Sequence, residues 1–168
     1  MIIKIFGVRF HDINFYQFCK MKFGGLVVFP SGPGLSTIRS DKIYHKSIQN
    51  ADIAIFDSGY FVLLLRIFKG LRVAKFSGYK FLKLFLNSYK NKKFFIVEAD
   101  RKSAIINKKY FKKYNIDVKN RQYIAPIYKK NSYISDICLI QILKKKKPSV
   151  ILINLGGGTQ EGLGSYIK

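Results

Sequence analysis

The chain has 168 residues, enough for one domain with a buried core. Lys and Arg number 31 against 9 Asp and Glu, so the formal net charge is +22 and an anionic partner is expected. Because 48% of the residues are hydrophobic and 15% are aromatic, the composition excludes an intrinsically disordered chain.

Short apolar runs alternate with segments of helical period along the sequence. In chain order, the pattern predicts strands and helices in alternation: a strand at 26–29, a helix at 35–49, a strand at 52–56, a helix at 60–68, a strand at 72–76, a helix at 80–89, a strand at 94–98, a helix at 104–114, a strand at 122–125, a helix at 135–146 and a strand at 150–154. This alternation is typical of a parallel sheet flanked by helices. We therefore expect a Rossmann-like α/β fold, mostly parallel, in a single domain over residues 1–168.

Three loops that contain glycine follow predicted strands. They are Pro-Ser-Gly-Pro-Gly at 30–34, Asp-Ser-Gly at 57–59 and Gly-Gly-Gly-Thr-Gln-Glu at 156–161. The carboxyl ends of parallel strands form the ligand crevice of such folds, so we expect these loops to converge. Glycines there allow backbone N–H groups to approach a phosphate, although each glycine is equally explained as part of a turn. The last loop lacks the third glycine of a dinucleotide-binding motif and the Gly-Lys of a P-loop, which disfavours a dehydrogenase or an ATPase.

Two parts of the sequence carry a family resemblance. NADIAIFDSG at 50–59 and VAKFSGYKFL at 73–82 lie in the stretch from Val27 to Leu82, which needs no gap between Ser31 and Lys75. KPSVILINLGGGTQEGLG at 147–164 contains a Lys-Pro pair, an apolar strand, glycines and a Gln-Glu pair, in the order of the same family's closing motif. On these motifs the chain resembles the WecG/TagA/CpsF glycosyltransferases, glycosyltransferase family 26.

The resemblance implies an inverting hexosyltransferase. Its expected reaction moves an N-acetylhexosamine, such as N-acetylmannosamine, from a UDP-sugar to a polyprenyl-diphosphate-linked sugar acceptor. The expected pathway makes teichoic acid, common antigen or capsule at the cytoplasmic face of the cell membrane. No cofactor and no nucleic acid are implied, and an oligomer is left open. Because family members continue into a basic C-terminal segment and this chain stops at Lys168, we expect either a C-terminally truncated product or a fragment.

The resemblance also assigns roles to three positions in the first half of the chain. The family's general base falls on Asp57, its substrate-contacting Asn on Ser31 and its phosphate-side Arg on Lys75. Ser has a shorter reach than Asn, and Lys lacks the bidentate geometry of Arg. With Asp-Ser-Gly in place of the usual Asp-Gly, these departures indicate a divergent branch whose sugar specificity does not carry over.

In the closing motif, the family's Gln-Glu pair falls on Gln160 and Glu161. We assign both to substrate binding, together with the backbone amides of Gly156, Gly157 and Gly158. A cluster of amides and a helix N-terminus suits the diphosphate of a nucleotide-sugar. The remaining acids contain no Asp-x-Asp pair, so no metal ligand is assigned.

The chemistry of Asp57 leaves two interpretations open. Inverting sugar transfer needs a carboxylate that accepts the proton of the acceptor hydroxyl, together with groups that stabilise the departing diphosphate. Asp57 can supply the carboxylate, whereas Asp52 lies at the other end of the strand and on the opposite face. Alternatively, Asp57 only caps the helix that is predicted to begin at Tyr60.

Membrane contact is a further expectation. Apolar residues alternate with lysines on one predicted helix, and lysines crowd another: Phe81, Leu82, Leu84 and Phe85 with Lys80 and Lys83, then Lys108, Lys109, Lys112 and Lys113. Such stripes fit the anionic inner membrane surface, but helices with a core-facing side and a basic outer side explain them equally well. The sequence start lacks a signal peptide and the longest apolar run, 60–65, is too short to span a bilayer, so we expect a cytoplasmic, peripheral protein. The alternative to an enzyme is a non-catalytic basic module that binds nucleic acid or anionic membrane.

Overall fold

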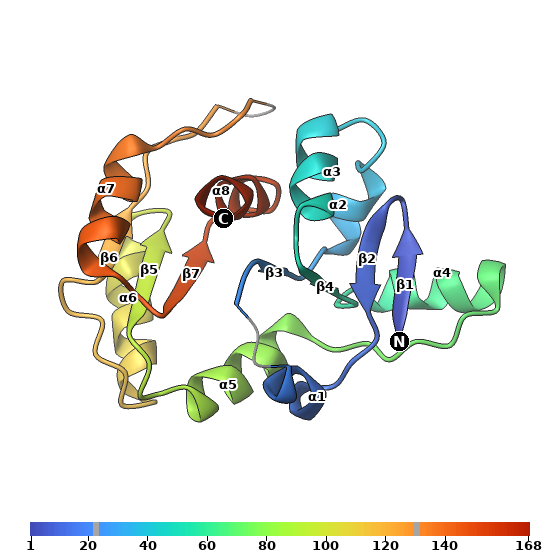
Figure 1. The fold of residues 1–168 in the computed structure, drawn as a ribbon, viewed down its shortest axis with the longest axis horizontal. Coiled ribbons are helices and arrows are strands. Elements are labelled where there is room, and N and C mark those ends of the chain that lie inside the picture. Colours follow the sequence, from blue (N-terminus) through green and yellow to red (C-terminus); the bar gives the residue numbers. More distant parts are fainter. Residues whose placement is uncertain (22–23, 130–131) are drawn as a thin grey trace. The chain divides into compact units, whose positions relative to one another are not determined.

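The computed structural model describes residues 1–21, 24–129 and 132–168, which form two compact units. The first unit comprises Met1–Leu84 together with Lys168, and the second comprises Phe85–Ile167. Each unit has its own sheet and its own helices (Figure 1). The α/β class and the mostly parallel, Rossmann-like arrangement are confirmed, although the described strands divide between two sheets. The single-domain organisation stays a prediction.

The first unit contains a four-stranded sheet in the order β1-β2-β4-β3. Its strands are β1 (Ile2–Ile5), β2 (Val8–His11), β3 (Val27–Val28) and β4 (Ile53–Ile55). The β1 and β2 strands form an antiparallel hairpin, whereas β2 and β3 both run parallel to β4. The helices of this part are α1 (Phe15–Lys20), α2 (Gly32–Ser36), α3 (Lys42–Gln49), α4 (Gly59–Lys69) and the first part of α5 (Gly78–Ser88).

The hairpin of β1 and β2 is absent from the sequence prediction. Its two-residue turn, Phe6-Gly7, has φ angles of 52° and 76°, and a phenylalanine in the left-handed region is not a recognisable turn signal. Two side chains of α3 hold the turn from outside: Nε2 of Gln49 donates to the carbonyl oxygen of Phe6 at 3.3 Å, and Nε2 of His45 lies 2.5 Å from the same oxygen. A long-range contact thus stabilises a local conformation that the turn residues do not themselves favour.

The predicted helix at 35–49 is wrong as a single element, because the chain breaks between α2 and α3. The break occurs where Asp41 caps α3 by accepting a hydrogen bond from the backbone N–H of Tyr44 at 2.8 Å. Such a side-chain cap favours a new helix start over continuation of the preceding one.

The predicted strand at 72–76 is also wrong. The segment pairs with no neighbouring strand among the described residues. Two separate hydrogen bonds fix its position instead. The N–H of Phe76 donates to the carbonyl of Phe56 at 2.8 Å, and the N–H of Ala74 donates to Oδ1 of Asp12 at 3.0 Å. The apolar residues of the segment therefore pack against the rest of the first unit, and the segment forms no strand.

The second unit contains a parallel three-stranded sheet in the order β6-β5-β7. Its elements are β5 (Phe94–Glu98), α6 (Arg101–Lys112), β6 (Gln122–Ile124), α7 (Ile137–Lys146), β7 (Val150–Asn154) and α8 (Thr159–Ile167) (Figure 1). The predicted bounds of β5 and β7 are confirmed, and every residue of β5 is buried. The α8 helix, absent from the prediction, contains Gly162 and Gly164, which have low helix propensity; Leu163 between them is fully buried and anchors the helix.

Candidate functional site

Two of the three predicted loops meet within the first unit. The loop after β3 leads into α2, and the loop after β4 leads into α4. A Cβ atom placed on Gly32 would lie 3.2 Å from Oγ of Ser58, so the two loops are in close contact. Their convergence follows from the parallel pairing of β3 with β4, which brings both carboxyl ends to one edge of the sheet.

Asp57 is half-buried in the second of these loops, directly beyond β4. Its Oδ1 accepts a hydrogen bond from the backbone N–H of Gly78 at 2.8 Å. The alternative role, as the cap of α4, is wrong: the N-cap is Ser58, whose hydroxyl accepts from the N–H of Phe61 at 3.2 Å. Asp57 instead holds the first residue of α5, and its Oδ2 has no hydrogen-bond donor among the described residues.

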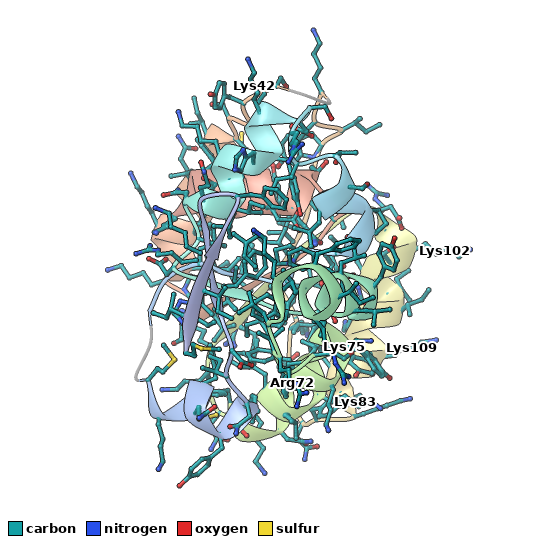
Figure 2. The ribbon with its side chains drawn as sticks, turned by 90° about the vertical axis from the view of Figure 1, so that its right-hand side faces the viewer. Lys42, Arg72, Lys75, Lys83, Lys102 and Lys109 are labelled. Carbon is teal, nitrogen blue, oxygen red and sulfur yellow. The ribbon has the colours of Figure 1, made fainter. Side chains whose placement is uncertain are left out.

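Lys75 lies beside the start of α4. A Cβ atom placed on Gly59 would be 3.4 Å from Nζ of Lys75, so the ammonium group sits against the first residue of that helix. Lys75 is exposed and has no carboxylate partner within ion-pair distance in the described parts of the chain (Figure 2). Its charge is therefore available to an anionic ligand.

Ser31 occupies the N-cap position of α2, but its hydroxyl makes no capping hydrogen bond. The residue is exposed, so its hydroxyl is accessible to a ligand from solvent. Asp52, by contrast, lies before β4 and accepts a hydrogen bond from the N–H of Leu26 at 2.8 Å. The first unit thus brings Ser31, Asp57 and Lys75 to the ends of β3 and β4 and keeps Asp52 at the opposite end of β4.

The third loop lies in the second unit and connects β7 to α8. Gly156 and Gly157 are exposed, and a Cβ atom on either would meet nothing within 4 Å. Gly158 has a φ of 87°, a conformation in which a side chain is strained. The first two amides of the loop are therefore open to a ligand, and the third depends on glycine.

Glu161 is buried and caps the helix in which it lies. Its Oε2 accepts a hydrogen bond from the N–H of Gly158 at 2.7 Å, and its Oε1 accepts from Nε2 of Gln160 at 3.1 Å. A glutamate in the first turn that accepts from the N-cap amide is half of a capping box. The amide of Gly158 is thus already bonded to a carboxylate, and Gln160 contacts that same carboxylate.

Glu98, which ends β5 and is fully buried, was not predicted as a site residue from the sequence. Its Oε2 accepts from Nδ2 of Asn107 at 2.8 Å and from Nδ2 of Asn154 at 3.4 Å, while its Oε1 accepts from Nε2 of Gln122 at 3.1 Å. The network links all three strands of this sheet to α6. A glutamate at the end of the apolar run Phe-Phe-Ile-Val-Glu was the available signal.

A third buried carboxylate, Asp136, caps α7. It accepts hydrogen bonds from the N–H of Leu139 at 2.9 Å and from the hydroxyls of Tyr128 at 2.7 Å and Tyr123 at 2.9 Å. Burial raises the pKa of Asp136, but these three hydrogen bonds outweigh burial and leave the pKa below its usual value. Burial, followed by the bond to Asp136, raises the pKa of Tyr123 to about 12 and also raises that of Tyr128.

Both histidines belong to the first unit. His11 is buried at the end of β2, and burial lowers its pKa. His45 lies against the β1–β2 turn. In the described ranges no three His, Cys, Asp or Glu side chains are grouped as metal ligands, and no helix is both long and apolar enough to cross a membrane.

The chain matches a known protein family. The model of the glycosyl transferase WecG/TagA/CpsF family matches residues 3–167. No curated protein matches the chain. The family match includes the loops that carry Ser31, Asp57 and Lys75 in the first unit and the loop at 156–161 in the second.

Proposed function

Because this chain belongs to the WecG/TagA/CpsF family of glycosyltransferases, whose members act in the biosynthesis of cell-surface polysaccharides, we propose that it is an inverting, UDP-sugar-dependent hexosyltransferase. The donor sugar is an N-acetylhexosamine, such as N-acetylmannosamine, and the acceptor is a sugar linked to polyprenyl diphosphate. The observation that supports a more specific proposal than family membership alone is the position of Asp57. Its carboxylate is oriented by Gly78 and keeps one oxygen without a hydrogen-bond donor among the described residues.

Asp57 acts as the general base in this proposal. The acceptor hydroxyl oxygen attacks the anomeric carbon of the donor, the hydroxyl proton passes to Oδ2 of Asp57, and the bond between the anomeric carbon and the diphosphate oxygen breaks. UDP leaves with the electron pair of that bond. A general base of this kind typically contributes about 10²- to 10⁴-fold to the rate.

Lys75 and Ser31 serve the donor. The ammonium group of Lys75 stabilises the negative charge that develops on the departing diphosphate. Its position beside the first residue of α4 supports this role, because the helix N-terminus adds partial positive charge at the same place. The exposed hydroxyl of Ser31 binds a polar group of the substrate.

The loop of the second unit supplies backbone amides. The open N–H groups of Gly156 and Gly157 bind diphosphate oxygens, while Glu161 maintains the loop through the amide of Gly158. For the diphosphate to use the Gly158 amide as well, the carboxylate of Glu161 must first leave it. Gln160, which contacts Glu161, is the second substrate-binding side chain of the motif.

The acceptor lipid determines the place of action. A polyprenyl-linked sugar is held in a bilayer, so we propose that the protein works peripherally at the inner face of the cell membrane. The high positive charge of the chain supports attraction to an anionic membrane surface.

Hydrogen exchange tests whether the donor is a UDP-sugar. UDP or a UDP-sugar is expected to slow exchange of the amides at 156–161 in the intact chain, and a panel of UDP-sugars ranks the donor sugars. The control is an unrelated polyanion, such as heparin, at the same charge concentration. Equal protection by both would contradict a donor site and favour the non-catalytic basic module.

A further inference from the structure

The α4 helix is amphipathic, with one side packed on the core of the first unit. Phe61, Val62 and Leu65 face that core, and Leu65 is buried. Leu65 is the one buried residue of this helix, all of which lies in the described part of the chain. Most of an apolar helix is therefore left on the surface.

The outer side of α4 carries large hydrophobic side chains. They are exposed to 69% at Tyr60, 49% at Leu63, 62% at Ile67 and 76% at Phe68. Their spacing of three, four and one residues places them on adjoining surfaces of one helix. We call these four residues the α4 apolar face. A contiguous exposed face of this kind marks an interaction surface.

Basic residues lie beside the α4 apolar face and form what we call its basic rim, Arg66, Lys69 and Arg72. Arg66 and Lys69 are exposed on the same helix, and Arg72 is exposed three residues beyond it. Residues 58–84 contain six Lys or Arg and no Asp or Glu. Figure 2 shows the side chain of Arg72 together with those of Lys75 and Lys83 along this part of the first unit.

The α5 stripe that the sequence analysis offered for membrane contact is different. Phe81 is buried, with its ring packed against those of four other phenylalanines: Phe15, Phe18, Phe29 and Phe76. The core-facing interpretation of this stripe is therefore confirmed at Phe81, and the membrane interpretation is wrong there. Most exposed apolar side chains of this region belong to α4, and Tyr79 of α5 is exposed as well.

The charge around the α4 apolar face distinguishes between two occupants, a second copy of the chain and a lipid bilayer. In a two-fold contact with a second copy, Arg66, Lys69 and Arg72 of one chain would oppose like charges of the other. A bilayer with anionic lipids complements both the apolar side chains and the basic rim. We propose that α4 docks the protein on an anionic phospholipid bilayer, with the α4 apolar face inserted among the lipids and the basic rim on their phosphates.

This inference rests on the proposed function only for the reason why the protein would bind a bilayer, which is that a polyprenyl-linked acceptor is held there. The docking itself needs neither sugar donor nor acceptor. Vesicle binding and sugar transfer are therefore measured separately. Transfer to a water-soluble, short-chain acceptor reports on the proposed function even where vesicle binding is lost.

A tryptophan reporter tests insertion directly, because the chain contains no tryptophan. The intact Phe68→Trp variant is mixed with vesicles of phosphatidylcholine and phosphatidylglycerol. We expect its emission to shift to shorter wavelength and to be quenched by brominated lipid chains. The control is Ile106→Trp, which replaces a residue of α6 that is 56% exposed. An unchanged spectrum of Phe68→Trp, or equal quenching of the two variants, would overturn the proposal.

Paired variants test which side chains hold the vesicle. Arg66→Gln with Lys69→Gln should lower the vesicle partition coefficient by about 30-fold. Ile67→Ser with Phe68→Ser should lower it by about tenfold or more. The matched controls are Ile105→Ser with Ile106→Ser on α6, and Lys144→Gln with Lys145→Gln on α7, which change the same number of exposed apolar or charged residues. Equal losses in variants and controls would show binding through overall charge or apolarity and would contradict α4 docking.

Sedimentation velocity tests the alternative occupant of the α4 apolar face, a second copy of the chain. We expect the same sedimentation coefficient for the wild-type chain and for Ile67→Ser with Phe68→Ser. A wild-type dimer that this variant converts to monomer, with vesicle binding unchanged, would identify the α4 apolar face as a contact between copies and overturn the lipid assignment.

Discussion

Oδ1 of Asp57 accepts a hydrogen bond from the backbone N–H of Gly78, with 2.8 Å between the two atoms. The bond joins the loop after β4 to the first residue of α5, 21 residues further along the chain. It fixes the direction of the carboxylate and leaves Oδ2 for other partners. Asp57 thus has a structural role through one oxygen and a proposed chemical role through the other, and a suitable substitution separates them.

The capping role belongs to Ser58. Ser58→Ala removes the acceptor for the N–H of Phe61, so we expect the free energy of unfolding to fall by about 1 kcal/mol. Sugar transfer by the folded variant should be retained. Denaturant unfolding measures the change, with Ser36→Ala, at the exposed end of α2, as the control. A loss no larger than that of the control would contradict the assignment of the cap.

Lys75 should matter for the donor more than other exposed lysines do. Lys75→Ala removes a charged partner of the diphosphate, so we expect UDP to bind about tenfold more weakly. Lys145→Ala, on the exposed side of α7, lowers the net charge equally and should leave UDP affinity unchanged. Isothermal titration calorimetry measures both. Indistinguishable affinities would remove Lys75 from the donor site.

The Glu98 network should stabilise the second unit. Three side-chain amides donate to its carboxylate, so Glu98→Gln places a fourth amide group against donors that need an acceptor. We expect the free energy of unfolding to fall by about 1 to 3 kcal/mol. Asp100→Asn is the matched control, because Asn caps the exposed start of α6 about as well as Asp. Equal stabilities of the two variants would contradict a stabilising network at Glu98.

The cluster around Asp136 predicts how stability depends on pH. The pKa of Asp136 is lowered on folding, so its contribution is present above the unfolded value of 3.8 and is lost as the pH falls through the folded value. The pKa of Tyr123 is raised from 10.0 to about 12, so its contribution is present below pH 10 and is lost as the pH rises toward 12.

The double variant Tyr123→Phe with Tyr128→Phe isolates the contribution of the two tyrosines to stability at alkaline pH, because the lysines titrate equally in both proteins. The stability difference between wild type and variant should be constant from pH 7 to about 9 and should shrink above pH 10. Chemical unfolding across this range measures the difference. A difference that stays constant up to pH 12 would show that the tyrosine hydroxyls do not titrate with unfolding.

Regular patterns made much of the fold predictable. The apolar runs at 94–98 and 150–154 become strands with the expected bounds, because they pair with each other in the sheet of the second unit, where the first is buried and the second is partly buried. The pairing of β3 with β4 also produces the expected approach of the loops at 30–34 and 57–59. In these places the local pattern and the tertiary packing agree.

Long-range partners account for what the sequence did not reveal. The Phe6-Gly7 turn depends on α3, and the segment 72–76 is held by single bonds from residues distant in sequence. Likewise, Asp57 bonds to Gly78 instead of its own helix, which no local spacing indicates. The half capping box of Glu161 was visible from its place three residues after Gly158, but the family motif pointed to substrate instead.

The most direct measurement of the central claim is sugar transfer by Asp57→Asn. The amide keeps an oxygen that accepts from Gly78, so folding and UDP affinity should change little, as thermal unfolding and calorimetry would show. The amide does not accept a proton, so transfer to a short-chain polyprenyl-diphosphate sugar should fall by about 10²-fold or more. Transfer at the wild-type rate by the folded, UDP-binding variant would contradict the role of Asp57 as the general base.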